Sequence, residues 1–215
     1  MRGLPDPPIL VITDSRQARR PLEEIAAAVF AAGCRWLSLR EKDLAAASRL
    51  DLLRRLVALG RAHGAVVTVH EDVAAARDAG AAGVHLPAGV AVGPARDAVG
   101  VAALIGCSAH SGAELAAMRG ADYATLSPIF ASASKPDYGP PLGVGALAAA
   151  IGVAPLPVLA LGGVAVANAA SCIAAGARGV AVMGAVMAAD KPAAVMTGLI
   201  KAVSAALAAR GGTAP

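Results

Sequence analysis

The sequence predicts a single small (β/α)8 barrel, an α/β TIM-barrel fold, that spans residues 1–215. Short apolar, strand-like runs recur eight times, and alanine-rich segments with helical spacing follow most of them. Glycines stand where several of these helices should end, just before the next strand. Runs that are apolar on both faces and separated by helices indicate parallel strands that are buried on each side and joined by crossover connections.

The predicted strands follow one another at short intervals along the whole chain. They begin near Ile9, Arg35, Val66, Gly83, Leu104, Tyr123, Pro157 and Gly179. Gly33, Gly80, Gly120 and Gly176 are expected to close the preceding helices, because glycine adopts the left-handed conformation without steric cost. The rival fold is an open doubly wound sheet, which predicts a G-x-G-x-x-G turn after the first strand. The first strand is followed instead by the residues TDSR, which favours the barrel.

Composition limits the classes of partner. The chain is 57% hydrophobic and only 16% charged, which argues against disorder and for a compact core. Aromatic residues make up 2%, so few rings are present to stack on bases, and nucleic-acid binding is not expected. The 19 Lys and Arg exceed the 15 Asp and Glu by four, spread along the chain without a basic block. A small anionic substrate suits this charge better than a polymer.

The sequence also indicates a cytoplasmic protein that does not enter a membrane. The first ten residues, MRGLPDPPIL, lack the continuous apolar region of a signal peptide. The longest stretch without charge, from Tyr138 to Ala177, is broken by prolines and glycines and cannot span a bilayer. Cys34, Cys107 and Cys172 are an odd number in no metal-type spacing, as expected of buried thiols in a reducing compartment.

Polar residues gather at the predicted strand ends, where the loops of such barrels build the active site. Arg40 and Lys42 alternate by two at the end of the second strand, so both can reach phosphate oxygens. Ser132, Ser134 and Lys135 arrive from the sixth strand end and complete an anion pocket. The alternative for the arginine and lysine is a solvated rim, with Glu41 and Asp43 as their surface partners. The loop after the sixth strand, from Ser132 to Pro141, is long enough for a lid or a binding loop, or it is a plain exposed turn.

Two further groups stand at strand ends. Gly162, Gly163 and Gly184 match the place where these barrels bind phosphate through backbone N–H groups, with tight-turn glycines as the alternative. Three histidines, His70, His85 and His110, end successive units, which suggests a metal site, but no carboxylate or cysteine stands at a companion ligand spacing on the same element. Pocket or core histidines are therefore favoured over metal ligands.

Six segments together resemble a known family. LREKD, GVHLP, IGCSAHS, SPIFASASKP, LALGGV and GVAVMGA have the order and spacing of the thiamine phosphate synthase / TenI superfamily, from about residue 9 to about residue 191. The resemblance implies a thiamine biosynthesis enzyme of the TIM-barrel type that acts as a homodimer on small phosphorylated pyrimidine and thiazole substrates. The synthase branch joins hydroxymethylpyrimidine diphosphate to thiazole phosphate and releases pyrophosphate with the help of Mg²⁺.

The resemblance also implies roles for individual residues. Arg40 and Lys42 correspond to the diphosphate-binding pair, and Ser108 to a serine placed near the pyrophosphate. The catalytic group expected is Arg40, Lys42, Lys135 and His110. The substrate-binding group expected is Ser38, His70, His85, Ser108, Ser132, Ser134, Gly162, Gly163, Met183 and Gly184.

Several positions depart from the synthase pattern. His70 and Glu71 replace an Asn-Asp pair, and Val90 replaces a second magnesium-binding aspartate. Ser38 replaces a glutamine and Gly184 a serine. Glu71 is the remaining candidate ligand for Mg²⁺, with the substrate phosphates supplying most of the other oxygens.

Two alternatives stay open. A TenI-like thiazole tautomerase aromatises thiazole carboxylate phosphate by proton transfer without magnesium, but its histidine falls at Pro128 here, so His110 or His70 would have to move the proton. The second alternative is a non-catalytic protein that binds thiazole phosphate or thiamine phosphate. The synthase is preferred because the set of anion-binding residues is present and Pro128 follows the synthase pattern.

Overall fold

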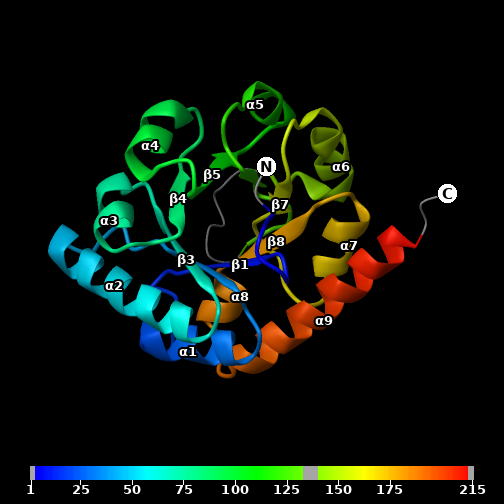
Figure 1. Cartoon of the computed structure of the whole chain (residues 1–215). Helices are drawn as coiled ribbons and strands as arrows, with labels where there is room; N and C mark the ends of the chain where they lie inside the picture. Colours follow the sequence, from blue (N-terminus) through cyan, green and yellow to red (C-terminus); the bar gives the residue numbers. More distant parts are fainter. Residues whose placement is uncertain (1–2, 133–139, 213–215) are drawn as a thin grey trace.

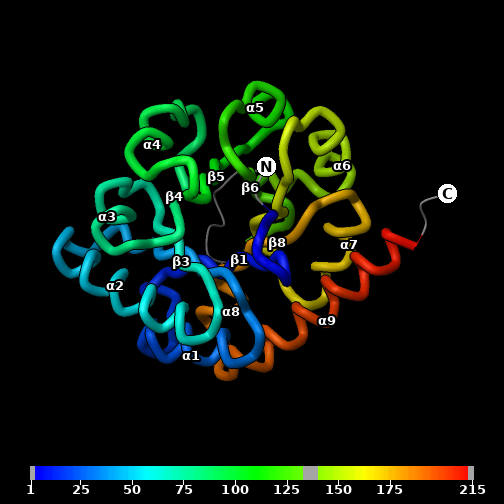
Figure 2. Tube along the Cα trace, viewed as in Figure 1, coloured from blue at the N-terminus to red at the C-terminus, as the bar shows by residue number. Residues whose placement is uncertain are grey.

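The computed structural model describes residues 3–132 and 140–212 and shows a closed barrel of parallel strands (Figure 1). The strands follow chain order around the barrel, and the last strand pairs with the first. Helices form a ring around the outside, as the tube in Figure 2 makes clear. The predicted (β/α)8 fold is confirmed, because each crossover returns the chain to a parallel neighbour.

The strands begin within one residue of the predicted positions. Arg35 and Pro157 each precede the strand that they were expected to start, and Pro157 has no N–H to give to the sheet. The strands are β1 (Ile9–Ile12), β2 (Trp36–Leu39), β3 (Val66–His70), β4 (Gly83–Leu86), β5 (Leu104–Ala109), β6 (Tyr123–Leu126), β7 (Val158–Ala160) and β8 (Gly179–Val182).

The helices alternate with these strands, and β8 is followed by two. They are α1 (Leu22–Ala31), α2 (Ala46–Ala62), α3 (Val73–Asp78), α4 (Val92–Val99), α5 (Gly112–Ala117), α6 (Gly143–Val153), α7 (Ala169–Ala174), α8 (Gly184–Met187) and α9 (Pro192–Gly211). The expected glycine ends are confirmed at Gly33 after α1, Gly80 after α3 and Gly176 after α7, with φ of 102°, 61° and 105°. The expectation is wrong at Gly120, because α5 ends at Ala117 and its C-cap, Met118, is already extended.

The barrel has two apolar clusters and a polar layer. The larger cluster lies between the strands and the helices, while the smaller one fills the barrel interior with side chains such as Leu10, Trp36, Tyr123 and Leu159. Further along the same strands, toward their carboxyl ends, the interior becomes polar. The buried polar side chains on these strands are Ser38, Thr68, His85 and Thr125. This polar layer forms the base on which the strand-end residues stand.

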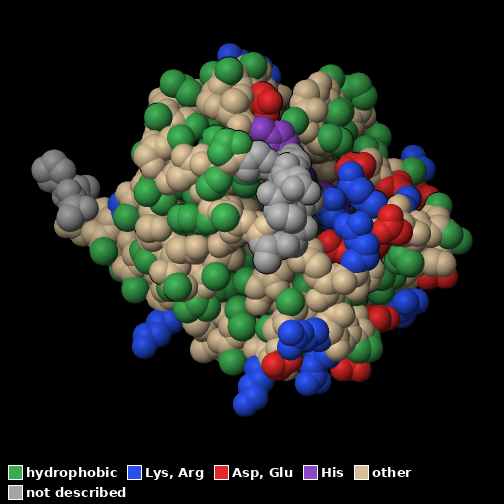
Figure 3. Space-filling view, turned by 180° about the vertical axis from the view of Figure 1, so that it is seen from behind, with side chains coloured by type: hydrophobic (Ala, Val, Ile, Leu, Met, Phe, Trp, Pro, Cys, Tyr) green, Lys and Arg blue, Asp and Glu red, His purple; other side chains and the backbone are tan. Residues whose placement is uncertain are grey.

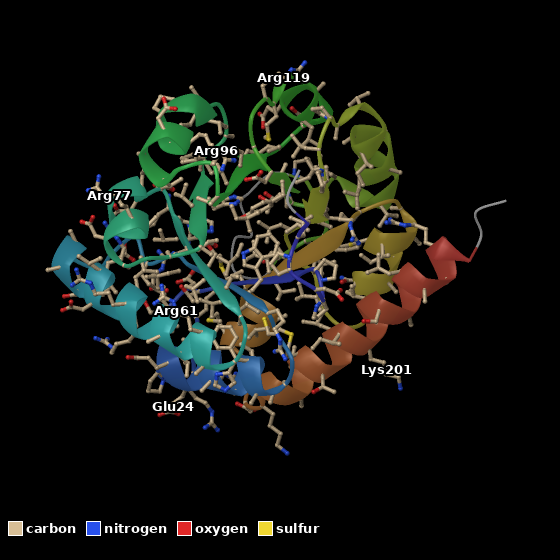
Figure 4. The ribbon with its side chains drawn as sticks, viewed as in Figure 1. Glu24, Arg61, Arg77, Arg96, Arg119 and Lys201 are labelled. Carbon is tan, nitrogen blue, oxygen red and sulfur yellow. The ribbon has the colours of Figure 1, made fainter. Side chains whose placement is uncertain are left out.

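Helix α9 crosses the outside of the barrel against α1, α7 and α8. Among the described residues it is the one helix long and apolar enough to span a membrane by length and composition alone. Its buried residues Met196, Leu199 and Val203 recur at helical spacing and face the barrel, which accounts for part of its apolar character. The labelled Glu24, Arg77, Arg119 and Lys201 side chains lie on the outer ring, away from the barrel axis (Figure 4).

Candidate active site

A cavity of about 670 Å³ opens at the carboxyl ends of the strands. Figure 3 shows the face opposite to that of Figure 1, where basic and acidic side chains gather together beside a histidine. The predicted residues that line the cavity are Arg40, Lys42, His70, Glu71, Ser108, His110, Ser132, Gly162, Gly163, Met183 and Gly184. Most of the candidate residues at the strand ends therefore lie in one site.

One edge of the cavity carries opposite charges. Lys42 Nζ lies 2.8 Å from Glu71 Oε1, and both side chains are about half exposed. The backbone N–H of Arg40 donates to Thr13 Oγ1 at 2.9 Å, which fixes the start of the β2–α2 loop against the end of β1. Glu71 has a φ of 66°, which is uncommon for a residue with a side chain. The ion pair thus places a carboxylate beside Lys42, one of the two cations expected to bind phosphate.

The residue between the two cations faces the other way. Glu41 is only 5% exposed, and its carboxylate accepts hydrogen bonds from the Ser15 backbone N–H at 3.0 Å and from the Ser15 hydroxyl at 2.5 Å. The alternative in which Glu41 is a solvated partner of Arg40 and Lys42 is wrong, because the carboxylate is turned inward to hold the β1–α1 loop. Arg40 and Lys42 are consequently free of this neighbour.

A second hollow of about 500 Å³ adjoins this charged edge. It shares Arg40, Lys42, His70 and Glu71 with the main cavity. The remaining lining residues are Glu41, Arg49, Asp72 and Val73. Arg49 and Asp72 are already paired at 2.7 Å, and Asp72 also caps α3. The shared residues therefore form the boundary between the two spaces.

Two histidines stack beneath this edge. The rings of His70 and His85 are 4.6 Å apart between centroids, and His70 pairs with His85 in the sheet register. Burial lowers the pKa of His85 to about 3. Burial, and then the nearby His85, Arg40 and Lys42, hold the pKa of His70 well below its usual range. Both rings are neutral at physiological pH, and His70 Nε2 is buried without a hydrogen-bond partner among the described residues.

His85 is held on both sides by hydroxyl groups. Its Nδ1 lies 3.0 Å from the Tyr123 hydroxyl, and its Nε2 lies 3.0 Å from Ser108 Oγ. Thr125 Oγ1 is 3.4 Å from the same Nε2. Of these groups, Ser108 lines the cavity. The sequence did not predict this series of hydrogen bonds, because it depends on which side chains meet across β4, β5 and β6.

The opposite edge of the cavity is made by glycines. Gly162 and Gly163 have φ of 94° and 63°, and a Cβ on Gly163 would lie 2.4 Å from the Ala131 carbonyl oxygen. These positions therefore need glycine both for conformation and for space. A Cβ on Gly184, at the start of α8, would lie 2.9 Å from Gln17 Oε1, so a side-chain amide fills the space beside it. Met183 Sδ accepts a hydrogen bond from Gln17 Nε2 at 3.4 Å.

His110 lies on the wall between these edges. Its Nδ1 is 3.0 Å from the Ser127 carbonyl oxygen, which acts as an acceptor, so Nδ1 carries the proton in the neutral ring. Its backbone N–H donates to Glu114 Oε2 at 2.7 Å, close to the Ser111 cap of α5. These bonds orient the imidazole at the cavity wall.

Not every predicted residue lies at the cavity surface. Ser38 and His85, expected to bind substrate, are 0% and 1% exposed and do not line the cavity. Inward-facing side chains alternate along a strand, so Ser38 lies one layer beneath Arg40. Ser134 and Lys135 lie outside the described residues. Sequence reasoning missed the apolar lining, which includes Ile12, Phe130, Leu161 and Val164.

In the described part of the chain, Glu71 is the one carboxylate that lines the main cavity. Among the described residues, no group of three or more His, Cys, Asp or Glu side chains is arranged to hold a metal ion. Glu71 is engaged by Lys42, and Val90, 46% exposed after β4, offers no ligand atom. The other carboxylates that line the adjoining hollow, Glu41 and Asp72, are held by Ser15 and Arg49. These residues do not form a magnesium site by themselves.

Comparison with known proteins identifies the family of the chain. The sequence profile of the family described as thiamine monophosphate synthase matches residues 9–186. The chain belongs to the thiamine monophosphate synthase family. It is 40% identical over 201 residues to the thiamine-phosphate synthase of Roseiflexus castenholzii, covering 89% of this chain and 86% of that one. It is also 40% identical over 183 residues to that of Methanoculleus marisnigri, covering 83% and 87%.

A solved structure gives the same result. Thiamine phosphate pyrophosphorylase from Pyrococcus furiosus superposes with a TM-score of 0.81 at 27% identity, covering 93% of this chain and 96% of the other. The 3-hexulose-6-phosphate synthase structure, at 20% identity and a TM-score of 0.66, shares the fold alone. Membership of the family therefore rests on sequence and on structure together.

Proposed function

We propose that this protein is a thiamine phosphate synthase, a transferase that joins hydroxymethylpyrimidine diphosphate to thiazole phosphate and releases pyrophosphate. The observation that carries the proposal is the division of one cavity into a charged edge at Arg40 and Lys42 and an uncharged glycine edge at Gly163 and Gly184. Family membership and the likeness to relatives with this name support it. One cavity is thereby suited to two phosphorylated substrates.

The charged edge suits the diphosphate. In the proposed reaction the bond between the pyrimidine methylene carbon and the diphosphate oxygen breaks, and the electron pair leaves with the diphosphate. Arg40 offers a planar set of donors, and Lys42 a mobile point charge, to the oxygens that gain negative charge. The bound diphosphate competes with Glu71 for Lys42, whose ion pair is half exposed and therefore weak.

The glycine edge suits the thiazole phosphate. Gly162 and Gly163 line this edge, and the space that a Cβ would need at each is filled by Pro128, Phe130 and Ala131. The two loops therefore pack closely, and backbone groups rather than long side chains are left to meet a phosphate. The apolar residues Ile12, Phe130 and Leu161 then surround the remaining space, where two aromatic rings would meet away from water. The thiazole nitrogen forms its bond to the pyrimidine methylene carbon there, as the diphosphate departs at the other edge.

Dependence on Mg²⁺, action in the cytoplasm and assembly as a homodimer stay predictions from the resemblance. The described residues offer one carboxylate, Glu71, at the charged edge, so Mg²⁺ uptake is expected to require diphosphate as a co-ligand. Calorimetric titration of Mg²⁺ with and without pyrophosphate measures this directly. Tight binding of Mg²⁺ to the protein alone would contradict it.

The experiment that tests the function is a coupled assay for thiamine phosphate from the two substrates, with and without Mg²⁺. The tautomerase substrate, thiazole carboxylate phosphate, is assayed in parallel with a chelator present. Formation of thiamine phosphate, lost in Arg40→Ala and retained in the outer-surface variant Arg77→Ala, is the expected result. Turnover of the tautomerase substrate alone would assign proton transfer to His110 or His70, and binding without turnover would indicate a phosphate-binding protein.

A further inference from the structure

A line of hydrogen-bonding groups runs from the barrel interior to the cavity wall. It starts at the Tyr123 hydroxyl, passes through both nitrogens of His85 and ends at Ser108 Oγ, with both links 3.0 Å long. Tyr123 and His85 are buried, and Ser108 is the member that lines the cavity. The three residues come from β6, β4 and β5, so the line crosses three neighbouring strands.

The barrel is built to hold Tyr123 in this place. A Cβ on Gly106 would lie 2.0 Å from Tyr123 Cζ, so the ring occupies space that only glycine leaves open. The Trp36 ring packs edge-on against Tyr123 with centroids 4.6 Å apart and an interplanar angle of 76°. The hydroxyl is therefore aimed at His85 Nδ1 by packing on two sides.

The protons along this line can be counted. Burial keeps His85 neutral, so its ring has one N–H and one lone pair. One neighbouring hydroxyl can donate to the lone pair, and the hydroxyl on the other nitrogen must accept from the N–H. The two possible tautomers therefore give Ser108 opposite roles at the cavity wall.

Tyr123 decides between the two tautomers. Among the described residues, His85 is the one hydrogen-bond partner of the Tyr123 hydroxyl. If His85 Nδ1 donated to that oxygen, the phenolic proton would be buried without an acceptor, which proteins avoid. A phenol is also a stronger proton donor than the aliphatic hydroxyls of Ser108 and Thr125. Tyr123 therefore donates to Nδ1, and the His85 proton lies on Nε2.

This tautomer makes Ser108 a donor toward the cavity. His85 Nε2–H donates to Ser108 Oγ at 3.0 Å, with Thr125 Oγ1 a more distant second acceptor at 3.4 Å. The serine oxygen accepts from within the barrel, so its own proton is left to point outward. A hydroxyl that accepts one hydrogen bond donates the next one more strongly.

We propose that Tyr123 and His85 are positioning residues that fix the Ser108 hydroxyl as a hydrogen-bond donor to the departing diphosphate. The identity of the anion rests on the proposed function. The direction of the hydrogen bonds is independent of that function. Ser108 then contributes a neutral donor from β5 to the same cavity that the two cations of the charged edge line. A donor aimed at the oxygen where negative charge develops stabilises the transition state more than the ground state.

The direct test is ¹⁵N NMR of the histidine-labelled protein, with the His85 signals assigned by their loss in His85→Asn. We expect a neutral ring with its proton on Nε2 in the wild-type protein, with and without pyrophosphate. A proton on Nδ1, or a charged ring at neutral pH, would overturn the proposal. This measurement needs no activity, so failure of the proposed function and failure of the hydrogen-bond chain are distinguishable.

A double-mutant cycle adds a functional readout. Tyr123→Phe is expected to lower kcat about tenfold with KM nearly unchanged, the loss of one oriented hydrogen bond. Ser108→Ala is expected to do the same, and the double variant to be no slower than Ser108→Ala alone. The matched control Leu10→Val lies in the same interior cluster but outside the hydrogen-bonded line, and it should keep kcat within about twofold. Additive losses in the double variant would overturn the proposal, as would a Leu10→Val variant as slow as Tyr123→Phe.

Discussion

The two edges of the cavity differ in how they can recognise phosphate. The edge at the ends of β2 and β3 carries Arg40, Lys42 and Glu71, whereas the described residues that β7, β8 and their loops contribute to the cavity wall are all uncharged. The first edge attracts an anion through long side chains that move and exchange partners. The second edge offers backbone groups in place of charged side chains, so the fixed shape of its loops decides which phosphate group fits. A synthase that distinguishes a diphosphate from a monophosphate needs this difference.

The layers beneath the two edges also differ, since one is polar and the other is apolar. Under the charged edge lie the stacked rings of His70 and His85, and under the glycine edge lie Leu159 and Ala181. Two neutral, buried imidazoles make the first side sensitive to pH, whereas an apolar layer does not titrate. The comparison can therefore be tested by substitutions at each edge and by pH.

The largest effect is expected at the glycine edge. In Gly163→Ala the new Cβ would lie 2.4 Å from the Ala131 carbonyl oxygen at a φ of 63°, so the loop must move. We expect thiazole phosphate binding to weaken about a hundredfold, or roughly 2.7 kcal/mol, by calorimetry. The matched control Gly145→Ala, where a Cβ meets nothing within 4 Å, should bind normally. Wild-type affinity in Gly163→Ala would place the phosphate elsewhere.

The next effect is expected at the charged edge. Arg40→Ala should weaken pyrophosphate binding by about 2 kcal/mol, the loss of a charge-assisted hydrogen bond. Arg40→Lys should recover part of this, because the charge returns without the planar donor set. The control is Arg77→Ala, whose side chain pairs with Asp78 on the outer surface. If both alanine variants bind pyrophosphate equally well, Arg40 has no part in the site.

The contrast between the edges also shows what a sequence can predict. Positions of strands and helix ends follow from local patterns, so the eight strands and the glycine ends such as Gly33 and Gly176 were predicted closely. Arg40, Lys42 and Gly163 were also predicted, because barrel topology places strand ends together. These inferences need no knowledge of which side chains touch.

Contacts between strands could not be predicted in this way. The bond of Tyr123 to His85 depends on the register of β4, β5 and β6, and the inward turn of Glu41 depends on a loop that presents Ser15. The Lys42–Glu71 ion pair likewise joins the ends of two strands. Each is a long-range geometric property, whereas the sequence pattern reports the local environment.

Stability should depend on pH through the histidine layer. Burial lowers the pKa of His85 to about 3 and holds that of His70 well below its usual range, whereas both are near 6.5 in the unfolded chain. Below pH 6.5 the unfolded state binds more protons, so stability is full above this pH and falls as pH decreases, by up to about 1.4 kcal/mol per pH unit for each histidine. Urea unfolding between pH 7 and pH 4 measures this slope. His85→Asn should flatten it, and an unchanged slope would contradict neutral burial of His85.

The smallest effect is expected from the ion pair at the charged edge. Glu71→Gln removes the carboxylate that holds Lys42 Nζ at 2.8 Å, so the lysine no longer leaves a partner when pyrophosphate binds. Because the pair is about half exposed, its loss should strengthen pyrophosphate binding in the absence of Mg²⁺ only about threefold, within the range of surface ion pairs. Added Mg²⁺ should reverse the sign, since Glu71 is the carboxylate at that edge that the ion could share with the diphosphate. Titrations in chelator and in Mg²⁺ separate the two effects, and equal changes in both would show that Glu71 acts on Lys42 alone.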